Sequence, residues 1–76
     1  MSAAEPAGVR VGPDDVGHRV VVRHQLPDGR YSDLLGELLA WDAEVVVRDR
    51  HGVEHTVRRG AVALAKRVPP PPERRR

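Results

Sequence analysis

Cysteine, isoleucine and phenylalanine are absent from this chain of 76 residues. Without cysteine there can be no disulfide framework, no thiolate zinc site and no cysteine nucleophile, a composition that suits a reducing cytoplasm. No apolar run approaches the ~18 residues that a bilayer-spanning helix needs. The first residues also lack the charged and apolar regions of a secretory signal. We therefore expect a cytoplasmic protein that does not contact a membrane.

Aromatic side chains are almost missing, since Tyr31 and Trp41 are the only two. Polyproline grooves, methyl-lysine cages and single-stranded nucleic-acid platforms each need several aromatic side chains close together. The sequence therefore argues against all three kinds of site. We expect Trp41 to lie in the hydrophobic core or to cover it, because so small a domain needs one large apolar side chain.

Positive charge is concentrated at the C-terminus. The net charge is +2, and five of the thirteen basic residues fall in the last eleven positions. The remaining chain carries eight basic and ten acidic residues, which does not fit a basic nucleic-acid-binding face. Candidate polyanion contacts are therefore confined to Arg74, Arg75 and Arg76.

The length allows one domain. Residues 1–12 are small and polar, and we expect them to be disordered. Residues 13–68 form the folded domain, and residues 69–76 form a proline- and arginine-rich linker or tail. Residues 66–72 also match a basic polyproline ligand pattern, although a semi-rigid spacer is the interpretation we favour.

The clearest structural signal is a β-hairpin around the sequence Asp49-Arg50-His51-Gly52. Asp first and Gly fourth favour a type I turn followed by a glycine bulge. A loop of three residues then places Val45 opposite Val57 and Val47 opposite His55 on one face. The other face pairs Arg48 with Glu54 and Glu44 with Arg58, so the charges of this face should largely cancel.

Three further strands complete an all-β fold. Strands are predicted for residues 18–25, 31–41 and 63–68, with a turn at residues 26–30 and a 3₁₀ connection at residues 59–62. Gly36 interrupts the long second strand and should mark a bend. A helix over residues 33–41 is the alternative, because its leucines also fit a helical stripe. The arrangement predicts a small five-stranded SH3-like barrel.

No catalytic group can be assigned. The acidic residues form no general acid–base pair, and neither serine lies in a nucleophile motif. His51 and His55 are separated by a hairpin turn and lack the three or four converging ligands that zinc requires. We expect no cofactor and no metal, and no enzymatic activity from this chain alone.

Several segments resemble one known family: residues 16–23, 26–30, 32–38 and 65–70. They are similar to the SH3-like domain that precedes the acetyltransferase domain in actinobacterial GNAT-superfamily proteins, the mycobacterial histone-acetyltransferase-like group. The similarity runs from about Val16 to Pro72, and the Gly36-Glu37-Leu38 stretch and residues 66–70 are its most specific parts. The Arg/Gln-x-x-Gly-x-Gly/Ala acetyl-CoA loop of such enzymes has no match here.

The resemblance implies an accessory role, either packing beside an acetyltransferase domain in cis or trans or contacting another protein. A small nucleic-acid-associated barrel that uses its basic tail is the alternative. The residues expected to form the interaction surface belong to the first loop and the bent strand, namely Leu26, Asp28, Arg30, Tyr31 and Trp41.

Overall fold

The computed structural model of the chain describes residues 8–69. Five antiparallel strands form one sheet in the order β4-β3-β2-β1-β5, and these residues contain no α-helix, so the all-β prediction is confirmed. The strands are β1 (Arg19–Gln25), β2 (Tyr31–Trp41), β3 (Glu44–Arg48), β4 (Glu54–Arg58) and β5 (Val62–Arg67). Short 3₁₀ helices precede β1 (η1, Pro13–Asp15) and β5 (η2, Arg59–Ala61).

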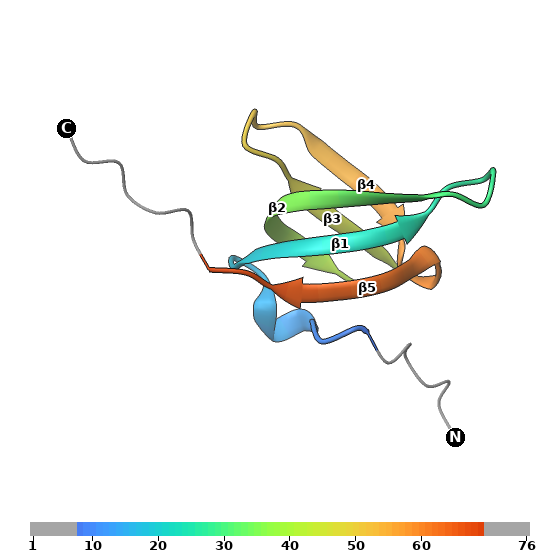
Figure 1. Ribbon diagram of the computed structural model, residues 1–76. Helices are drawn as coiled ribbons and strands as arrows, with labels where there is room; N and C mark the ends of the chain where they lie inside the picture. The colour runs from blue at the N-terminus through green and yellow to red at the C-terminus, as the bar shows by residue number, and fades with distance from the viewer. Residues whose placement is uncertain (1–7, 70–76) are drawn as a thin grey trace, which may run out of the picture.

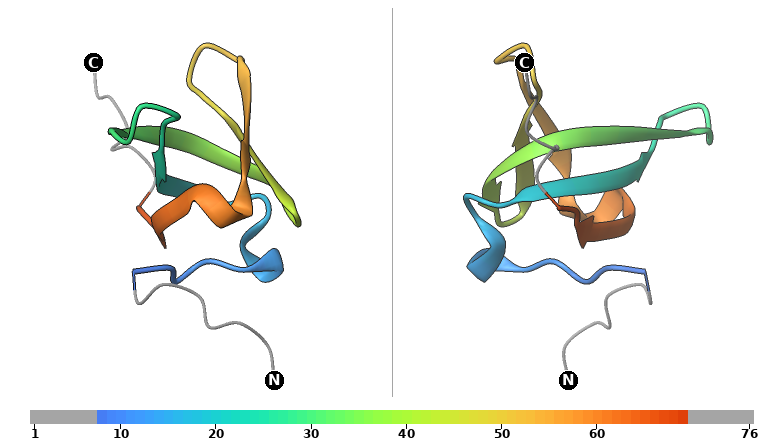
Figure 2. Two further views of the ribbon diagram at one scale, coloured as in Figure 1. Left: turned by 90° about the vertical axis from the view of Figure 1, so that its right-hand side faces the viewer. Right: turned by 60° about the vertical axis from the view of Figure 1, so that its left-hand side comes forward.

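The sheet bends so strongly that it makes two layers. Strands β1, β2 and β5 lie in front, and the β3–β4 hairpin passes behind them (Figure 1). Strand β2 belongs to both layers, because it pairs with β1 along Tyr31 to Glu37 and with β3 from Glu37 onward. The two views in Figure 2 show the hairpin crossing the other strands, as expected for a small barrel.

The predicted register of the second hairpin is confirmed. Val45 pairs with Val57, and Val47 pairs with His55. The Asp49 amide donates to the Val53 carbonyl at 2.9 Å and the Gly52 amide donates to the Asp49 carbonyl at 3.0 Å, as a type I turn with a glycine bulge requires. Gly52 accordingly has a φ of 81°.

The first hairpin repeats this construction. The Leu26 amide donates to the Arg30 carbonyl at 2.6 Å, and the Gly29 amide donates to the Leu26 carbonyl at 2.9 Å. Gly29 takes a φ of 91°, in the left-handed region that favours glycine. Pro27 and Asp28 occupy the central positions that suit them, so the predicted type I turn is present here too.

A bulge in β2 explains how its leucines and Trp41 are distributed. Leu34, Gly36 and Leu38 face the core with strict alternation, as their pairing with β1 and β3 shows. The register then shifts between Leu38 and Ala40, which moves Trp41 onto the core face. The helical alternative for residues 33–41 is wrong, because pairing with strands on both sides outweighs the leucine stripe.

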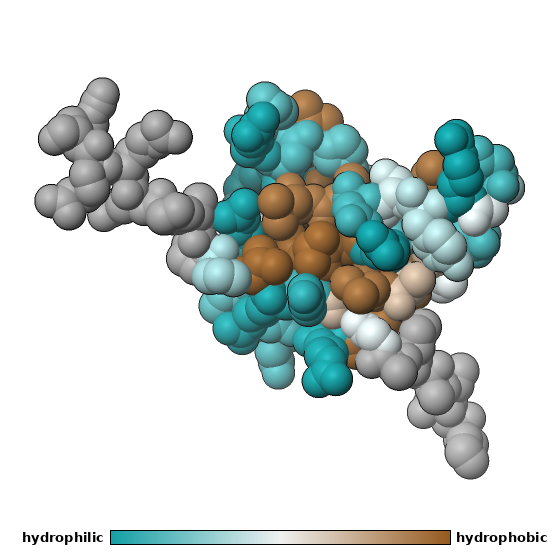
Figure 3. Space-filling view, in the orientation of Figure 1, coloured by the Kyte–Doolittle hydropathy of each residue, from teal (hydrophilic) through white to brown (hydrophobic). Residues whose placement is uncertain are grey.

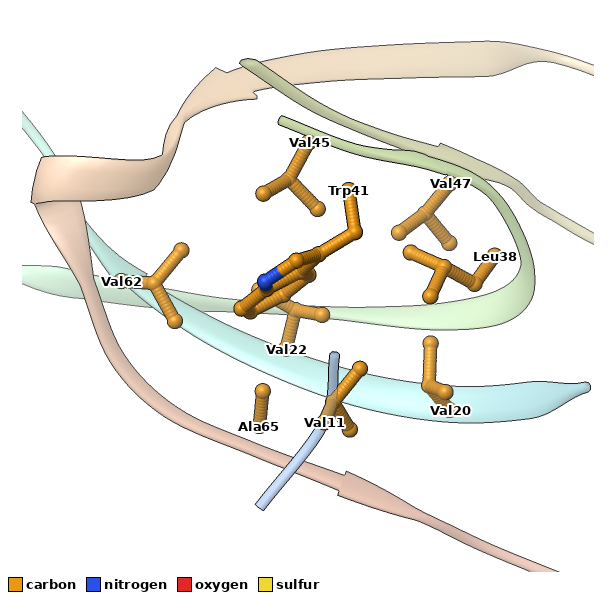
Figure 4. Packing of buried hydrophobic residues seen from close by; sticks show 9 residues of the cluster. All are labelled: Val11, Val20, Val22, Leu38, Trp41, Val45, Val47, Val62 and Ala65. Atoms are coloured by element: carbon orange, nitrogen blue, oxygen red, sulfur yellow. The ribbon is translucent and has the colours of Figure 1, made fainter. Parts of the chain in front are cut away.

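The core contains nine buried apolar residues. Trp41 lies at its centre, against Val22, Val45 and Val62 (Figure 4). The other members are Val11, Val20, Leu38, Val47 and Ala65. The prediction that Trp41 belongs to the core is confirmed, since only 6% of this residue is exposed.

The segment before η1 corrects one predicted boundary. Residues 8–12 were expected to belong to a disordered terminus, yet Val9 forms a parallel bridge with Ala65 and Val11 is 8% exposed in the core. The Arg10 amide donates to the Ala65 carbonyl at 2.7 Å. The folded domain therefore begins before Pro13, because the free edge of β5 offers hydrogen-bonding groups to this segment. The predictions for residues 1–7 and 70–76 lie outside the described residues.

Two strand ends differ slightly from expectation. Strand β1 begins at Arg19 rather than His18, and β5 spans Val62–Arg67 rather than residues 63–68. A shift of register between β1 and β5 brings both Val62 and Ala65 onto the core face. Within residues 8–69 no helix is long and apolar enough to cross a membrane.

Candidate functional site: an arginine-lined groove

One end of the barrel carries an open groove of about 1050 Å³. Four segments line it, residues 17–19, 35–37, 48–51 and 67–69, and we call it the arginine groove. It lies where the tip of the β3–β4 hairpin, the start of β1 and the end of β5 come together (Figure 1). Its walls carry four arginines, Arg19, Arg48, Arg50 and Arg67, against the two carboxylates of Glu37 and Asp49.

A row of charges crosses three strands at the wall of the groove. Arg19 of β1 lies opposite Glu37 of β2, which lies opposite Arg48 of β3. Glu37 accepts a hydrogen bond of 2.7 Å from Arg48. Arg19 instead donates to the Pro69 carbonyl at 3.4 Å, and no ion pair joins it to an acidic residue within residues 8–69. The row therefore holds one carboxylate between two guanidinium groups.

The next charged row on the same face shows the contrast. Arg23 lies opposite Asp33 and donates to it from Nε at 2.9 Å. This hydrogen bond lowers the pKa of Asp33. Arg23 therefore pairs with the carboxylate opposite it, Asp33. Glu37, the carboxylate opposite Arg19, instead pairs with Arg48 of β3.

The remaining cations of the groove differ in their partners. Arg67 donates to Asp15, and this hydrogen bond, with one from the Gly12 amide, lowers the pKa of Asp15. Arg50 donates to the His51 ring at 3.4 Å and forms no ion pair with an acidic residue in the described part of the chain. Arg19 and Arg50 are thus the two guanidinium groups of the groove that pair with no carboxylate among residues 8–69.

Asp49 is fully committed to the turn that carries Arg50. Its carboxylate accepts from the His51 amide at 2.8 Å and the Val53 amide at 3.0 Å, and it lies 2.8 Å from His55 Nε2. The bond with His55 and those with the two amides lower the pKa of Asp49 to about 2. Asp49 therefore keeps its negative charge, but its oxygens are used within the turn and make no ion pair with Arg50 in the described part of the chain.

The floor of the groove is apolar and partly bare. Leu35 of β2 points outward and is 46% exposed, while Gly36 presents only backbone. Val21, which lies opposite Leu35 on β1, and Leu64 of β5 extend this apolar surface across the sheet. Figure 3 shows apolar residues gathered in the middle of this face with polar residues around them. The groove therefore combines an exposed leucine with surplus positive charge.

The predicted interaction surface lies mostly elsewhere. Leu26, Asp28 and Arg30 form the β1–β2 loop at the opposite end of the barrel (Figure 1). There Arg30 donates to Asp28 through its amide at 3.0 Å and its Nε at 2.8 Å, so the two charges satisfy each other. Tyr31 follows this loop and is 55% exposed.

Trp41 does not belong to an exposed surface, because its side chain is enclosed by the core. Trp41 ends the bent strand, and the bulge in β2 turns its side chain inward. The structure does not bring Trp41 together with the loop at residues 26–30. The polyanion contacts predicted at Arg74, Arg75 and Arg76 lie outside the described residues.

The predicted charge cancellation on the second hairpin is only partly correct. The register places Arg48 opposite Glu54 and Arg58 opposite Glu44, as expected. The ion pair of Arg48 is nevertheless made with Glu37, and residues 8–69 show none between Arg58 and Glu44. The predicted register gives the correct cross-strand neighbours on β3 and β4. Arg48 nevertheless forms its ion pair with Glu37, which lies on β2.

A metal site finds no support in the described residues, which contain no group of three or more His, Cys, Asp or Glu side chains that could hold an ion. His51 is exposed in the turn, and His55 is half-buried beside Asp49. The pairing of His55 with Asp49 is a hairpin interaction that the sequence pattern alone did not indicate.

Arg19 and Leu35 are the residues that sequence reasoning missed. One signal was present, because Arg19 alternates with the buried Val20 and must face outward. Leu35 likewise falls between two inward positions of β2. What the alternation could not show is that the hairpin tip folds over this part of the sheet and turns it into a groove.

Comparison with known proteins identifies the domain type. The family model of the Rv0428c N-terminal Sm-like domain matches residues 13–66. No curated protein and no solved structure matches the chain. The match supports a small β-barrel-type domain, described as Sm-like where we expected SH3-like, and an acetyltransferase link does not follow from it. Sm-like domains of this kind are typically non-enzymatic.

Proposed function

Because the chain belongs to the family of Rv0428c N-terminal Sm-like domains, we propose that it is a non-catalytic interaction module that holds a protein partner in its arginine groove. The observation that carries this proposal is Leu35, which is 46% exposed on the groove floor. An apolar side chain beside unneutralised arginines is suited to a partner that covers the leucine and supplies negative charge.

The partner we propose is an acetyltransferase domain, joined to this module or supplied by another chain. The resemblance of residues 16–23, 32–38 and 65–70 to the domain that precedes such enzymes supports this choice. The groove opens beside Pro69, at the end of β5. A domain attached after residue 76 would therefore be joined to the edge of the groove through residues 70–76.

The test is association with an acetyltransferase domain encoded beside this chain, expressed separately and titrated by calorimetry. Leu35→Thr should weaken the association by about two- to threefold, since Leu35 is 46% exposed and threonine removes about half of the ~0.7–1.4 kcal/mol that burial of this exposed part contributes. Val53→Thr is the matched control, because Val53 is 51% exposed and lies outside the groove.

Two results would overturn the proposal. The first is the absence of any association between the chain and the acetyltransferase domain. The second is turnover of acetyl-CoA by the chain alone, which would show that the module is itself catalytic.

Polyanion binding is a second candidate, favoured by the lack of a carboxylate partner for Arg19 and Arg50. Arg74, Arg75 and Arg76 would add to it through non-specific, salt-dependent contacts. Retention on heparin that disappears when these three residues are deleted would confine polyanion binding to the tail. Retention that survives the deletion but is lost in Arg19→Gln would favour this second candidate.

A further inference from the structure

The charge balance of the arginine groove defines the chemistry of what can fill it. Glu37 is engaged by Arg48 at 2.7 Å, and Asp49 is engaged by His55 and two amides of its own turn. Within residues 8–69, neither carboxylate forms an ion pair with Arg19 or Arg50. A ligand that brings two negative groups would therefore be attracted by the groove and would find both guanidinium groups able to donate.

The shape and lining of the groove favour a peptide over a nucleic acid. Neither tyrosine nor tryptophan lines it, since Tyr31 lies at the far end of β2 and Trp41 is buried, and its only aromatic rings are the imidazoles of His18 and His51. Nucleic-acid bases bound as single strands stack on aromatic side chains, so this groove lacks their usual platform. Leu35, Val68 and Pro69 instead offer an apolar floor that an aliphatic side chain can cover.

The size of the groove agrees with a peptide. Its volume of about 1050 Å³ is at the upper end of the roughly 300–1,000 Å³ typical of small-ligand sites.

Resting on the proposed function, we propose that the arginine groove binds an acidic peptide segment of the partner. One aliphatic side chain of that segment packs on Leu35. Carboxylates on either side of it pair with Arg19 and Arg50. Arg19 and Arg50 bind the carboxylates of the peptide, and Leu35 packs against its aliphatic side chain. Neither the charged nor the apolar contact alone is sufficient for the complex.

The experiment uses the full chain and a short synthetic peptide with a central leucine flanked by glutamate and aspartate. Amide resonances are followed by NMR during the titration. We expect saturable shifts confined to residues 17–19, 35–37 and 48–51, and no such shifts with a peptide that carries glutamine and asparagine instead. A third peptide, with serine in place of leucine, should bind more weakly by about tenfold.

Variants of the chain test the assigned arginines. Arg19→Gln and Arg50→Gln should each weaken binding by up to about fivefold, the effect of losing one exposed ion pair. Arg30→Gln is the matched control, because Arg30 is an exposed arginine outside the groove that pairs with Asp28. Chemical-shift spectra of each variant establish that it remains folded.

Three outcomes would overturn the inference. They are no saturable binding of the acidic peptide, an equal loss of binding in Arg30→Gln, and a short oligothymidine that shifts the groove residues while the peptide does not. If the acetyltransferase domain still associates with Arg19→Gln and Arg50→Gln as tightly as with the native chain, the interaction module stands and only the acidic ligand is wrong. If that domain fails to associate while the peptide binds, the groove chemistry stands and the proposed partner is wrong.

Discussion

Gly36 is the residue at which the two layers of the barrel touch. A Cβ atom built at this position would lie 2.0 Å from the Arg48 carbonyl oxygen and 2.8 Å from its carbonyl carbon. These are backbone atoms, so no side-chain rotation can relieve the clash. We predict that Gly36→Ala lowers the free energy of unfolding by about 3 kcal/mol, as expected when backbone must move to admit an extra group. Urea denaturation followed by circular dichroism measures this loss.

Gly60→Ala is the control for that substitution. Nothing lies within 4 Å of a Cβ built at Gly60, so alanine there should change stability by less than about 1 kcal/mol. Equal stability of the two variants would show that the layers are not in contact at Gly36.

Asp49 links the hairpin turn to acid stability. Its folded-state pKa of about 2 lies below its ordinary value of 3.8, chiefly because of the hydrogen bond with His55 and those with the Val53 and His51 amides. A pKa that is lower in the folded state stabilises the fold at pH values above the unfolded-state pKa of 3.8. This contribution to stability is lost as the pH falls from 3.8 toward about 2. We therefore predict that Asp49→Asn lowers stability at neutral pH and that its difference from the native chain shrinks across this window.

Denaturation at a series of pH values measures that difference. Asp42→Asn is the comparison, because the side chain of Asp42 is exposed and makes none of the hydrogen bonds found among residues 8–69. A gap between Asp49→Asn and the native chain that stays constant down to a pH of about 2 would contradict the assigned role of Asp49.

At the scale of elements, the segment before η1 covers the edge of β5. Val11 is 8% exposed in the core, and the Ala65 amide donates to the Gly8 carbonyl at 3.1 Å. We predict that Val11→Ala lowers the free energy of unfolding by about 2 kcal/mol, from lost burial and the cavity left behind. Thermal unfolding should show it as a lower midpoint.

Val16→Ala provides the comparison, since Val16 is 45% exposed and should lose less than about 0.5 kcal/mol. Removal of residues 1–11 should destabilise the domain at least as much as Val11→Ala. A truncated chain of native stability would place the start of the domain at Gly12 after all.

The turns and their glycine bulges could be predicted from the sequence, but the bulge within β2 could not. The two glycine-bulge turns follow from local chemistry, because Asp and Gly stand at turn positions that suit them in both loops. Asp28 directly precedes Gly29, and Asp49 lies three positions before Gly52. The shift at Leu39 has no local signal of this kind. It is decided by closure of the sheet, which must bring Trp41 against Val45 after Leu38 has met Val47.

At the scale of the whole molecule, the groove arises only when three distant segments meet. The alternation of β1 and β2 indicates that Arg19 and Leu35 face outward. The pairing of β3 with β2 places Arg48 beside Glu37, and their ion pair leaves Arg19 without its cross-strand carboxylate. Pairing rules between two strands cannot predict which arginine binds Glu37, because Arg19 and Arg48 lie on different strands on either side of it.

The core also predicts how the molecule unfolds. Its nine buried residues come from β1, β2, β3, β5 and the segment before η1, and Val57 of β4 packs against them. With one core shared by every strand, we predict a single two-state transition. Trp41 fluorescence and far-ultraviolet circular dichroism should therefore give the same urea midpoint, although one reports the centre of the core and the other the whole backbone.

Val20→Ala tests this cooperativity, because Val20 is fully buried at 0% exposure. The substitution should cost about 2 kcal/mol and lower the thermal midpoint by about 10 °C, with both probes moving together. Val53→Ala, at a position 51% exposed, should leave both nearly unchanged. Separate midpoints for the two probes would contradict a single two-state transition.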